Sequence, residues 1–168
     1  HFDIYSSYYA GYHVDVVDYA QGEYHALLDI DEVRGTKNRN AGREGLPYLT
    51  ERDANGQWLV NCEKTDYVDT EAEYMWVHFV LPVQEPVMDG QVYIGGDVAY
   101  NQYTADNMMW YDSENGCYHT TLYLKQGGYN YMYYVKGRNG VSSLPLEGSH
   151  WQTGNAYCIM VYYHPFGE

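Results

Sequence analysis

Residues 118–135 constrain the fold more than any other segment, because two runs of alternating apolar residues flank a pair of glycines. The residues that share a face are Tyr118, Leu122 and Leu124 in the first run, and Tyr129, Tyr131, Tyr133 and Val135 in the second. Between them stands Gln126-Gly-Gly128, where glycine permits the positive φ values of a short hairpin. The pattern predicts an antiparallel hairpin of residues 118–125 and 129–136, with Tyr129, Tyr131 and Tyr133 buried.

The remaining apolar runs also indicate strands, since they are rich in β-branched and aromatic residues and end in Gly, Asp, Asn or Pro. The best helix candidate, Asp66–Met75, lacks an apolar stripe. The sequence therefore predicts an all-β fold. The predicted strands outside the hairpin are 12–17, 24–30, 57–60, 74–81, 91–95 and 156–163.

Two prolines in five residues, Pro82 and Pro86, favour a stiff connection between two halves of the chain. We expect a β-rich unit over residues 1–82 and an immunoglobulin-like antiparallel β-sandwich over residues 87–168. The first unit opens abruptly at His1, which is typical of a truncated domain or of a removed signal peptide or upstream domain. A polar segment with three glycines, Arg34–Leu46, predicts a long loop between strands.

Charge argues against two classes of partner. Acidic residues outnumber basic ones 23 to 9, which gives a formal charge of −14. Nucleic acids and anionic lipid surfaces are bound through cationic side chains, so neither is an expected partner. No apolar run approaches the roughly 20 residues of a membrane-spanning helix, so we expect no membrane insertion.

The three cysteines, Cys62, Cys117 and Cys158, are too few and too widely separated for a disulfide framework. We interpret them as buried small side chains in preference to a bridge or a reactive thiol. Cys158 alternates with Tyr157, Ile159 and Val161, which predicts a packed strand position.

Signatures of catalysis are weak throughout the sequence. The seven histidines are scattered, with no paired His or Cys at ligand spacing on one element. No serine stands in a Gly-x-Ser-x-Gly elbow, and Gly95-Gly-Asp97 is not followed by a helical pattern that would complete a phosphate loop. The expectation is a protein without a catalytic metal, without a cofactor and without hydrolase activity.

Aromatic residues in the second half are the remaining functional signal, because Tyr and Trp rings anchor protein partners and stack on sugars. The alternative is that several of these rings plug the ends of a small core. The candidate interaction surface consists of Tyr100, Tyr103, Trp110, Tyr111 and Trp151.

Five motifs occur in a specific order along residues 50–168. They are Asp53-Ala-Asn-Gly-Gln-Trp58, Glu73-Tyr-Met-Trp-Val-His-Phe-Val-Leu81, Val92-Tyr-Ile-Gly-Gly96, Leu124-Lys-Gln-Gly-Gly-Tyr-Asn-Tyr131, and Leu146-Glu-Gly-Ser-His-Trp-Gln-Thr-Gly-Asn-Ala-Tyr157 with Val161-Tyr-Tyr163. In this series the chain resembles the carboxy-terminal part of the Bacteroidetes plug proteins of the type IX secretion system, a family formerly known only as a domain of unknown function.

The resemblance implies a non-enzymatic periplasmic protein that docks on the outer-membrane translocon and closes it when no cargo is passing. It supplies no catalytic residues and no contact residues. It leaves open whether this member is the plug or a paralogue with another task.

A second similarity concerns the last 80 residues, which resemble the early-set immunoglobulin-like modules attached to glycogen- and starch-active proteins. The shared residues include Val92-Tyr-Ile-Gly-Gly-Asp97 and Gly128-Tyr-Asn-Tyr-Met-Tyr133. In those modules an Asn and a Trp help form the sugar platform, whereas Asn101-Gln-Tyr103 stands here. The similarity implies a sandwich fold, and carbohydrate binding is the alternative function, with weak or absent binding to α-glucans expected.

Overall fold

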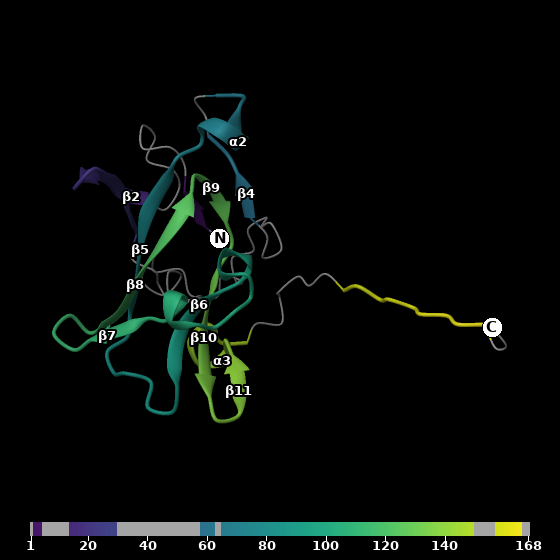
Figure 1. The fold of residues 1–168 in the computed structure, drawn as a ribbon. Helices are drawn as coiled ribbons and strands as arrows, with labels where there is room; N and C mark the ends of the chain where they lie inside the picture. Colours follow the sequence, from purple (N-terminus) through teal and green to yellow (C-terminus); the bar gives the residue numbers. More distant parts are fainter. Residues whose placement is uncertain (1, 5–13, 30–57, 63–64, 150–156, 166–168) are drawn as a thin grey trace, which may run out of the picture.

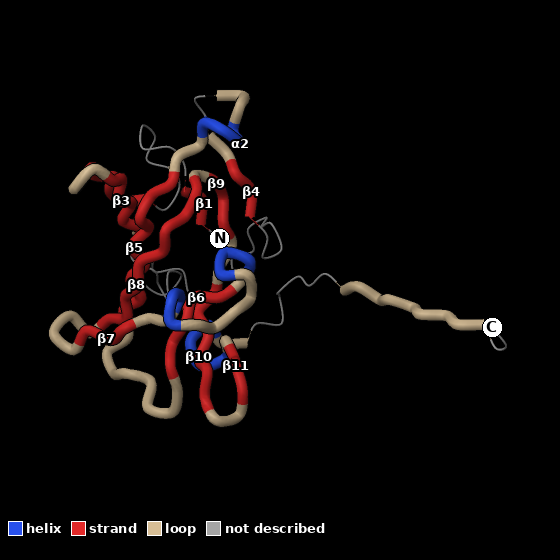
Figure 2. Tube along the Cα trace, in the orientation of Figure 1, coloured by secondary structure: helices blue, strands red, loops and turns tan. Residues whose placement is uncertain are grey.

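The computed structural model describes residues 2–4, 14–29, 58–62, 65–149 and 157–165. The strands in chain order are β1 (Phe2–Ile4), β2 (Val14–Ala20), β3 (Glu23–Leu28), β4 (Trp58–Val60), β5 (Tyr74–Pro82), β6 (Gln91–Gly95), β7 (Trp110–Asp112), β8 (Cys117–Lys125), β9 (Gly127–Tyr129), β10 (Met132–Gly137) and β11 (Gly140–Ser142). Short helical turns lie between them: α2 (Val68–Glu71), η1 (Asp97–Ala99), η2 (Ala105–Asn107) and α3 (Leu144–Glu147). The all-β prediction is confirmed (Figures 1 and 2).

The described strands form one five-stranded sheet and two three-stranded sheets. The large sheet has the order β2-β3-β5-β8-β7, and its longest contact is the antiparallel pairing of β5 with β8, from Tyr74↔Lys125 to Pro82↔Cys117. The small sheets have the orders β1-β9-β4 and β11-β10-β6. All pairings are antiparallel except that of β3 with β5. The small sheets face the large one across the core, as a sandwich requires.

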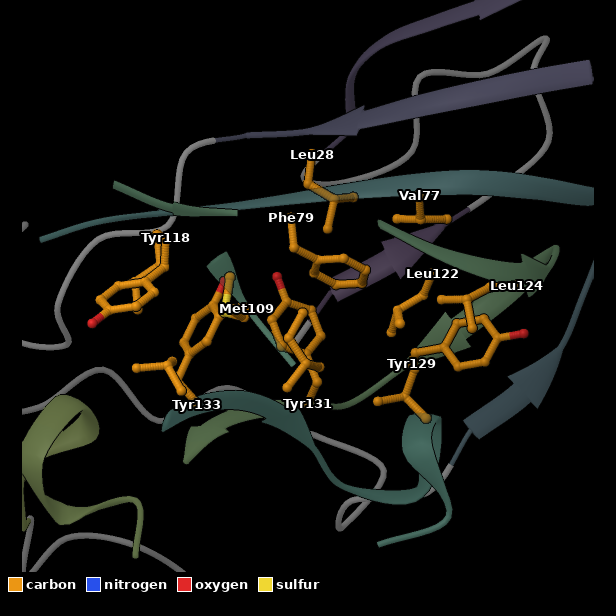
Figure 3. Close-up of a cluster of buried hydrophobic side chains, with 14 of the residues drawn as sticks. Leu28, Val77, Phe79, Met109, Tyr118, Leu122, Leu124, Tyr129, Tyr131 and Tyr133 are labelled. Carbon is orange, nitrogen blue, oxygen red and sulfur yellow. The ribbon is translucent and has the colours of Figure 1, made fainter. Parts of the chain in front are cut away.

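Alternation in β5 and β8 creates the large sheet's half of that core. Burial alternates residue by residue along both strands, so one face is buried and the other is half-buried or exposed. Figure 3 shows Phe79 and Leu122 directed toward the tyrosines of the opposite layer. Phe79 is 1% exposed and its ring meets Tyr131 edge-to-face, with centroids 4.9 Å apart. Such aromatic pairs join the two layers of the sandwich.

The predicted hairpin is wrong in its pairing and right in its burial. β8 pairs with β5 and β7, whereas residues 129–136 are divided between β9 and β10 in the two small sheets. Tyr129, Tyr131 and Tyr133 are buried as predicted, at 6%, 4% and 5% exposure. The aromatic alternation specified which residues face the core, but it did not specify the partner strands.

Gly127 explains why no turn forms at the glycine pair. Neither Gly127 nor Gly128 takes a positive φ. Gly127 lies opposite Val60 in β9, where an added Cβ would sit 2.1 Å from the carbonyl oxygen of Leu59. The preceding Gln126 is 2% exposed and is held by the backbone of Glu73. The backbone N–H of Gln126 donates to the Glu73 carbonyl, and the backbone N–H of Glu73 donates to Oε1 of the Gln126 side chain. Glycine is therefore required here for close approach of backbones, not for chain reversal.

The predicted boundary at Pro82–Pro86 does not separate two cores. β5 ends at Pro82, yet it pairs over nine residues with β8, which follows the prolines. The buried cluster extends from Ala26 to Val135 and includes Phe79 and Ile94 from the two sides. A single sandwich core thus combines the described parts of both predicted units.

The predicted strand at 156–163 is not present in the part of it that the structure describes. Residues 157–165 have no regular secondary structure and no buried side chain. Cys158, predicted to be packed, is exposed. In Figure 1 this segment extends away from the sandwich. The predicted loop Arg34–Leu46 lies outside the described residues.

Candidate functional site: the outer face of the five-stranded sheet

The side of the five-stranded sheet that points away from the core carries an unusual number of rings. Directly paired residues of neighbouring strands share a face, so the register identifies the members of this side. Trp76 pairs with His25 in β3 and with Tyr123 in β8, and His78 pairs with Leu27 and Thr121. We call this surface the outer face; its members are His25, Leu27, Tyr74, Trp76, His78, Val80, Trp110, His119, Thr121 and Tyr123.

Three aromatic rings form one end of the outer face. Tyr74 and Tyr123 are 52% and 50% exposed, and their rings stack with centroids 5.3 Å apart at an interplanar angle of 22°. Trp76 lies 4.7 Å from Tyr123, tilted by 43°. The indole Nε1 of Trp76 donates a hydrogen bond of 2.7 Å to Oε2 of Glu23, which fixes the orientation of the ring. These rings are held in place before any partner arrives.

Lys125 borders the aromatic rings. Its ammonium group lies 5.8 Å from the centroid of the Tyr74 ring and donates a 2.6 Å hydrogen bond to the backbone carbonyl of Asp69 in α2. The Lys125 ammonium therefore contacts both the face of the Tyr74 ring and a backbone carbonyl, and the cation–π contact helps to orient that ring.

Two histidines occupy the middle of the outer face. Nδ1 of His25 lies 3.0 Å from Nε2 of His78, and the two rings stack with centroids 5.3 Å apart. Nδ1 of His78 lies 3.1 Å from Oγ1 of Thr121. Burial, and secondly the neighbouring His25, lower the pKa of His78 below its ordinary value. The two rings thus share a hydrogen bond.

Within the described part of the chain, no three His, Cys, Asp or Glu side chains converge as metal ligands would. In the same residues, no helix is long and apolar enough to cross a membrane. The outer face offers rings, two aliphatic side chains and a histidine pair, with Glu23 and Lys125 at its margins. This chemistry suits the binding of an apolar surface.

The five predicted interaction residues do not form one surface. Trp110 is 61% exposed and belongs to the outer face through its pairing with His119. Tyr111, the next residue, faces the other way: its ring lies 5.0 Å from that of Tyr118 and its hydroxyl donates to the carbonyl of Gln84. The prediction of an exposed aromatic surface in this segment therefore applies to Trp110 and not to its neighbour.

Tyr100 and Tyr103 lie on the loop after β6. Tyr100 is 78% exposed and adopts a left-handed conformation with φ of 53° at the end of η1. Tyr103 is half-buried and packs edge-to-face against Tyr93 and Tyr134. Packing of Tyr103 matches the interpretation that some rings plug the core. Trp151 lies outside the described residues.

Sequence reasoning missed most of the outer face, although a signal was present. Both faces of the strand at residues 74–82 carry apolar or aromatic side chains. Tyr74, Trp76, His78 and Val80 lie on the face opposite the core positions. A strand with rings on both faces predicts either full burial or an exposed aromatic surface. The sequence does not say which of the two occurs, because that depends on what covers the sheet.

Comparison with known proteins supports the fold. No family model and no curated protein matches the chain. A crystal structure of a hypothetical protein from Parabacteroides merdae ATCC 43184 is similar, with a TM-score of 0.76 and 31% sequence identity over 88% of this chain. The match covers 35% of that protein, so the present chain corresponds to about one third of its length. The likeness bears out an all-β sandwich.

Proposed function

We propose that the chain is a non-enzymatic docking module that binds a protein partner through the outer face, in the manner expected of a type IX secretion plug. In this proposal the module lies in the periplasm, and its partner is the outer-membrane translocon. The observation that carries the proposal is the pre-ordered group formed by exposed Tyr74 and Tyr123 with half-buried Trp76 on a sheet face. The choice of the translocon as partner rests on the resemblance of the ordered motif series along residues 50–168.

Electrostatics support binding through this face. The chain carries a formal charge of −14, yet the outer-face positions of β5 and β8 include no Asp or Glu. The carboxylates beside them come from neighbouring strands and include Asp18, which pairs with His25, and Glu23, which accepts the hydrogen bond of Trp76. Interface centres are depleted of charged residues and enriched in Tyr and Trp, because burying an unpaired charge is costly. Acidic residues elsewhere keep the rest of the molecule hydrated and separate from other proteins.

Carbohydrate binding is the second candidate, favoured by the same three rings, since sugars stack on exposed aromatic faces. Two observations weaken it. Tyr74 and Tyr123 stack on each other, which engages part of each ring face. Tyr103, at the position of the platform Trp in the modules that resemble this chain, is half-buried between two other tyrosines.

A pull-down from outer-membrane extracts tests the docking proposal. The wild-type chain is compared with Tyr123→Ala and with Tyr67→Ala, whose ring is 73% exposed but lies outside the outer face. We expect the wild type and Tyr67→Ala to retain the translocon, and Tyr123→Ala to bind at least about tenfold more weakly, since truncated aromatic anchors cost on the order of 1–4 kcal/mol. Equal retention by all three variants contradicts docking through this face.

Calorimetry against soluble starch and cyclodextrins separates the second candidate. The docking proposal predicts no saturable heat of binding with either glycan. Saturable binding that disappears in Tyr123→Ala and persists in Tyr67→Ala would instead assign the outer face to carbohydrate.

A further inference from the structure

The segment Tyr157–Tyr163 is the largest exposed apolar feature among the described residues. Its side chains are almost fully in water, with Tyr157, Ile159, Val161, Tyr162 and Tyr163 each 84–89% exposed and Met160 71% exposed. In an extended chain, Tyr157, Ile159, Val161 and Tyr163 point to one side, and Cys158, Met160 and Tyr162 to the other. Both sides are apolar, which is typical of a strand covered on two faces.

We propose that residues 157–163, here called the tail strand, add to the edge of β2 in a second copy of this chain, and that two copies exchange their tail strands reciprocally. The inference concerns the β2 edge of the same five-stranded sheet and does not depend on the proposed function. Addition of a strand to a sheet edge satisfies the backbone groups of both and buries alternate side chains.

β2 is the acceptor because of its length and because no described strand lies on its other side. It pairs with β3 alone among the described strands and is seven residues long, the length of the tail strand. The other edge strands β1, β4, β7 and β11 have three residues each. The edge of β6 is already covered: Met109 donates its N–H to the carbonyl of Val92, and Nδ2 of Asn107 donates to that of Ile94.

Charge selects the tail strand over other strands as the partner of β2. β2 contains Asp18, so the like charges of two β2 edges would repel each other across a shared ladder. Residues 148–167 contain no Asp, Glu, Lys or Arg, in a chain whose formal charge is −14. An uncharged strand can approach the acidic edge without that repulsion.

The available area favours reciprocal exchange between two copies. Three tyrosines and four smaller apolar side chains offer roughly 800 Å² on one tail strand, taking 150–250 Å² as the area that an aromatic side chain buries. Two exchanged tail strands offer roughly 1,600 Å² on the tail side alone, which reaches the area of a stable, specific interface. A single tail strand bound to a different partner would bury only half of that area, which favours exchange between two copies.

Light scattering after size-exclusion chromatography of the full chain is the first test. We expect twice the chain mass for the wild type and the single mass for Ile159→Asp. The matched control is Met88→Asp, which adds the same charge at a position that is 88% exposed on the loop before β6, and it should remain a dimer. A monomeric wild type at about 100 μM would overturn the proposal.

A proline variant separates strand addition from nonspecific sticking of apolar side chains. Val161→Pro keeps an apolar side chain but removes a backbone donor and fixes φ, so it should yield monomer. A Val161→Pro protein that stays dimeric would show that the contact is no β-ladder, and the proposal would fail.

Cysteine cross-linking identifies the acceptor edge. Cys158 of one copy should form a disulfide under mild oxidation with a cysteine introduced as Asp18→Cys in a second copy that carries Cys158→Ser, both in a Cys117→Ser background. Replacing Asp18→Cys by Met88→Cys should abolish the covalent dimer. A cross-link that forms equally with either position, or with neither, would rule out exchange onto β2.

Discussion

At the residue scale, the outer face shows how a few side chains determine a surface. His78 is held between His25 and Thr121, and Trp76 is held by Glu23, so the rings have fixed positions at the surface. Fixed rings lose little conformational entropy on binding, which is the advantage of a pre-ordered docking surface.

His78 makes stability depend on pH. Its folded-state pKa is lowered by burial and by His25, so the unfolded chain binds more protons than the folded one between the ordinary value of about 6.5 and that lowered pKa. The free energy of unfolding should therefore have its full value above about pH 6.5. It should decrease as the pH falls from there to the lowered pKa of His78. Urea unfolding at several pH values measures this. His78→Gln should flatten this part of the profile.

At the element scale, β8, β9 and β10 show where sequence patterns suffice and where they fail. Alternation predicted the buried rows correctly, because side-chain direction is a local property of a strand. It did not predict the pairing, because Gly127 and Gly128 fit a turn and a close backbone approach equally well. The approach of Leu59 and Val60, more than 60 residues earlier in the sequence, decides between the two. The tail strand illustrates the same limit, since its alternation predicts a strand but not where its partner lies.

Gly127→Ala should destabilise the chain because the new Cβ would lie 2.1 Å from the Leu59 carbonyl oxygen. The backbone of β4 has to move, and we expect a cost of about 1–3 kcal/mol in the free energy of unfolding, measured by urea titration. Gly116→Ala is a useful comparison, since nothing lies within 4 Å of its Cβ and only the backbone strain at φ of 62° remains. Equal losses in the two variants would contradict close packing of β4 on β9.

At the scale of the whole molecule, one core replaces the two that the prolines suggested. The all-β sandwich was predictable from strand-like runs and turns. The single core was not, because Pro82 ends β5 at the edge of the core while β5 itself pairs with β8 from the other half. Of the outer-face residues, only Trp110 was predicted to be an interaction residue. The exposure of a strand face depends on whether other elements cover it, which the sequence pattern does not show.

Phe79→Ala tests the shared core. Phe79 is 1% exposed and contacts Tyr131 in the opposite layer, so its truncation should cost about 3–5 kcal/mol. Thermal unfolding followed by calorimetry should show one transition in the wild type, shifted as a whole to lower temperature in the variant. Two transitions, of which only one shifts, would show two independent units.

The central claim is that the outer face contacts a protein partner, and photo-cross-linking in cells tests it most directly. A photoreactive amino acid is placed at Tyr123 in the outer face and, as the control, at Tyr67 outside it. Irradiation should join the chain to an outer-membrane translocon component from position 123 and not from position 67. Cross-linking from position 67 alone, or from neither position in cells that export cargo normally, would contradict the account.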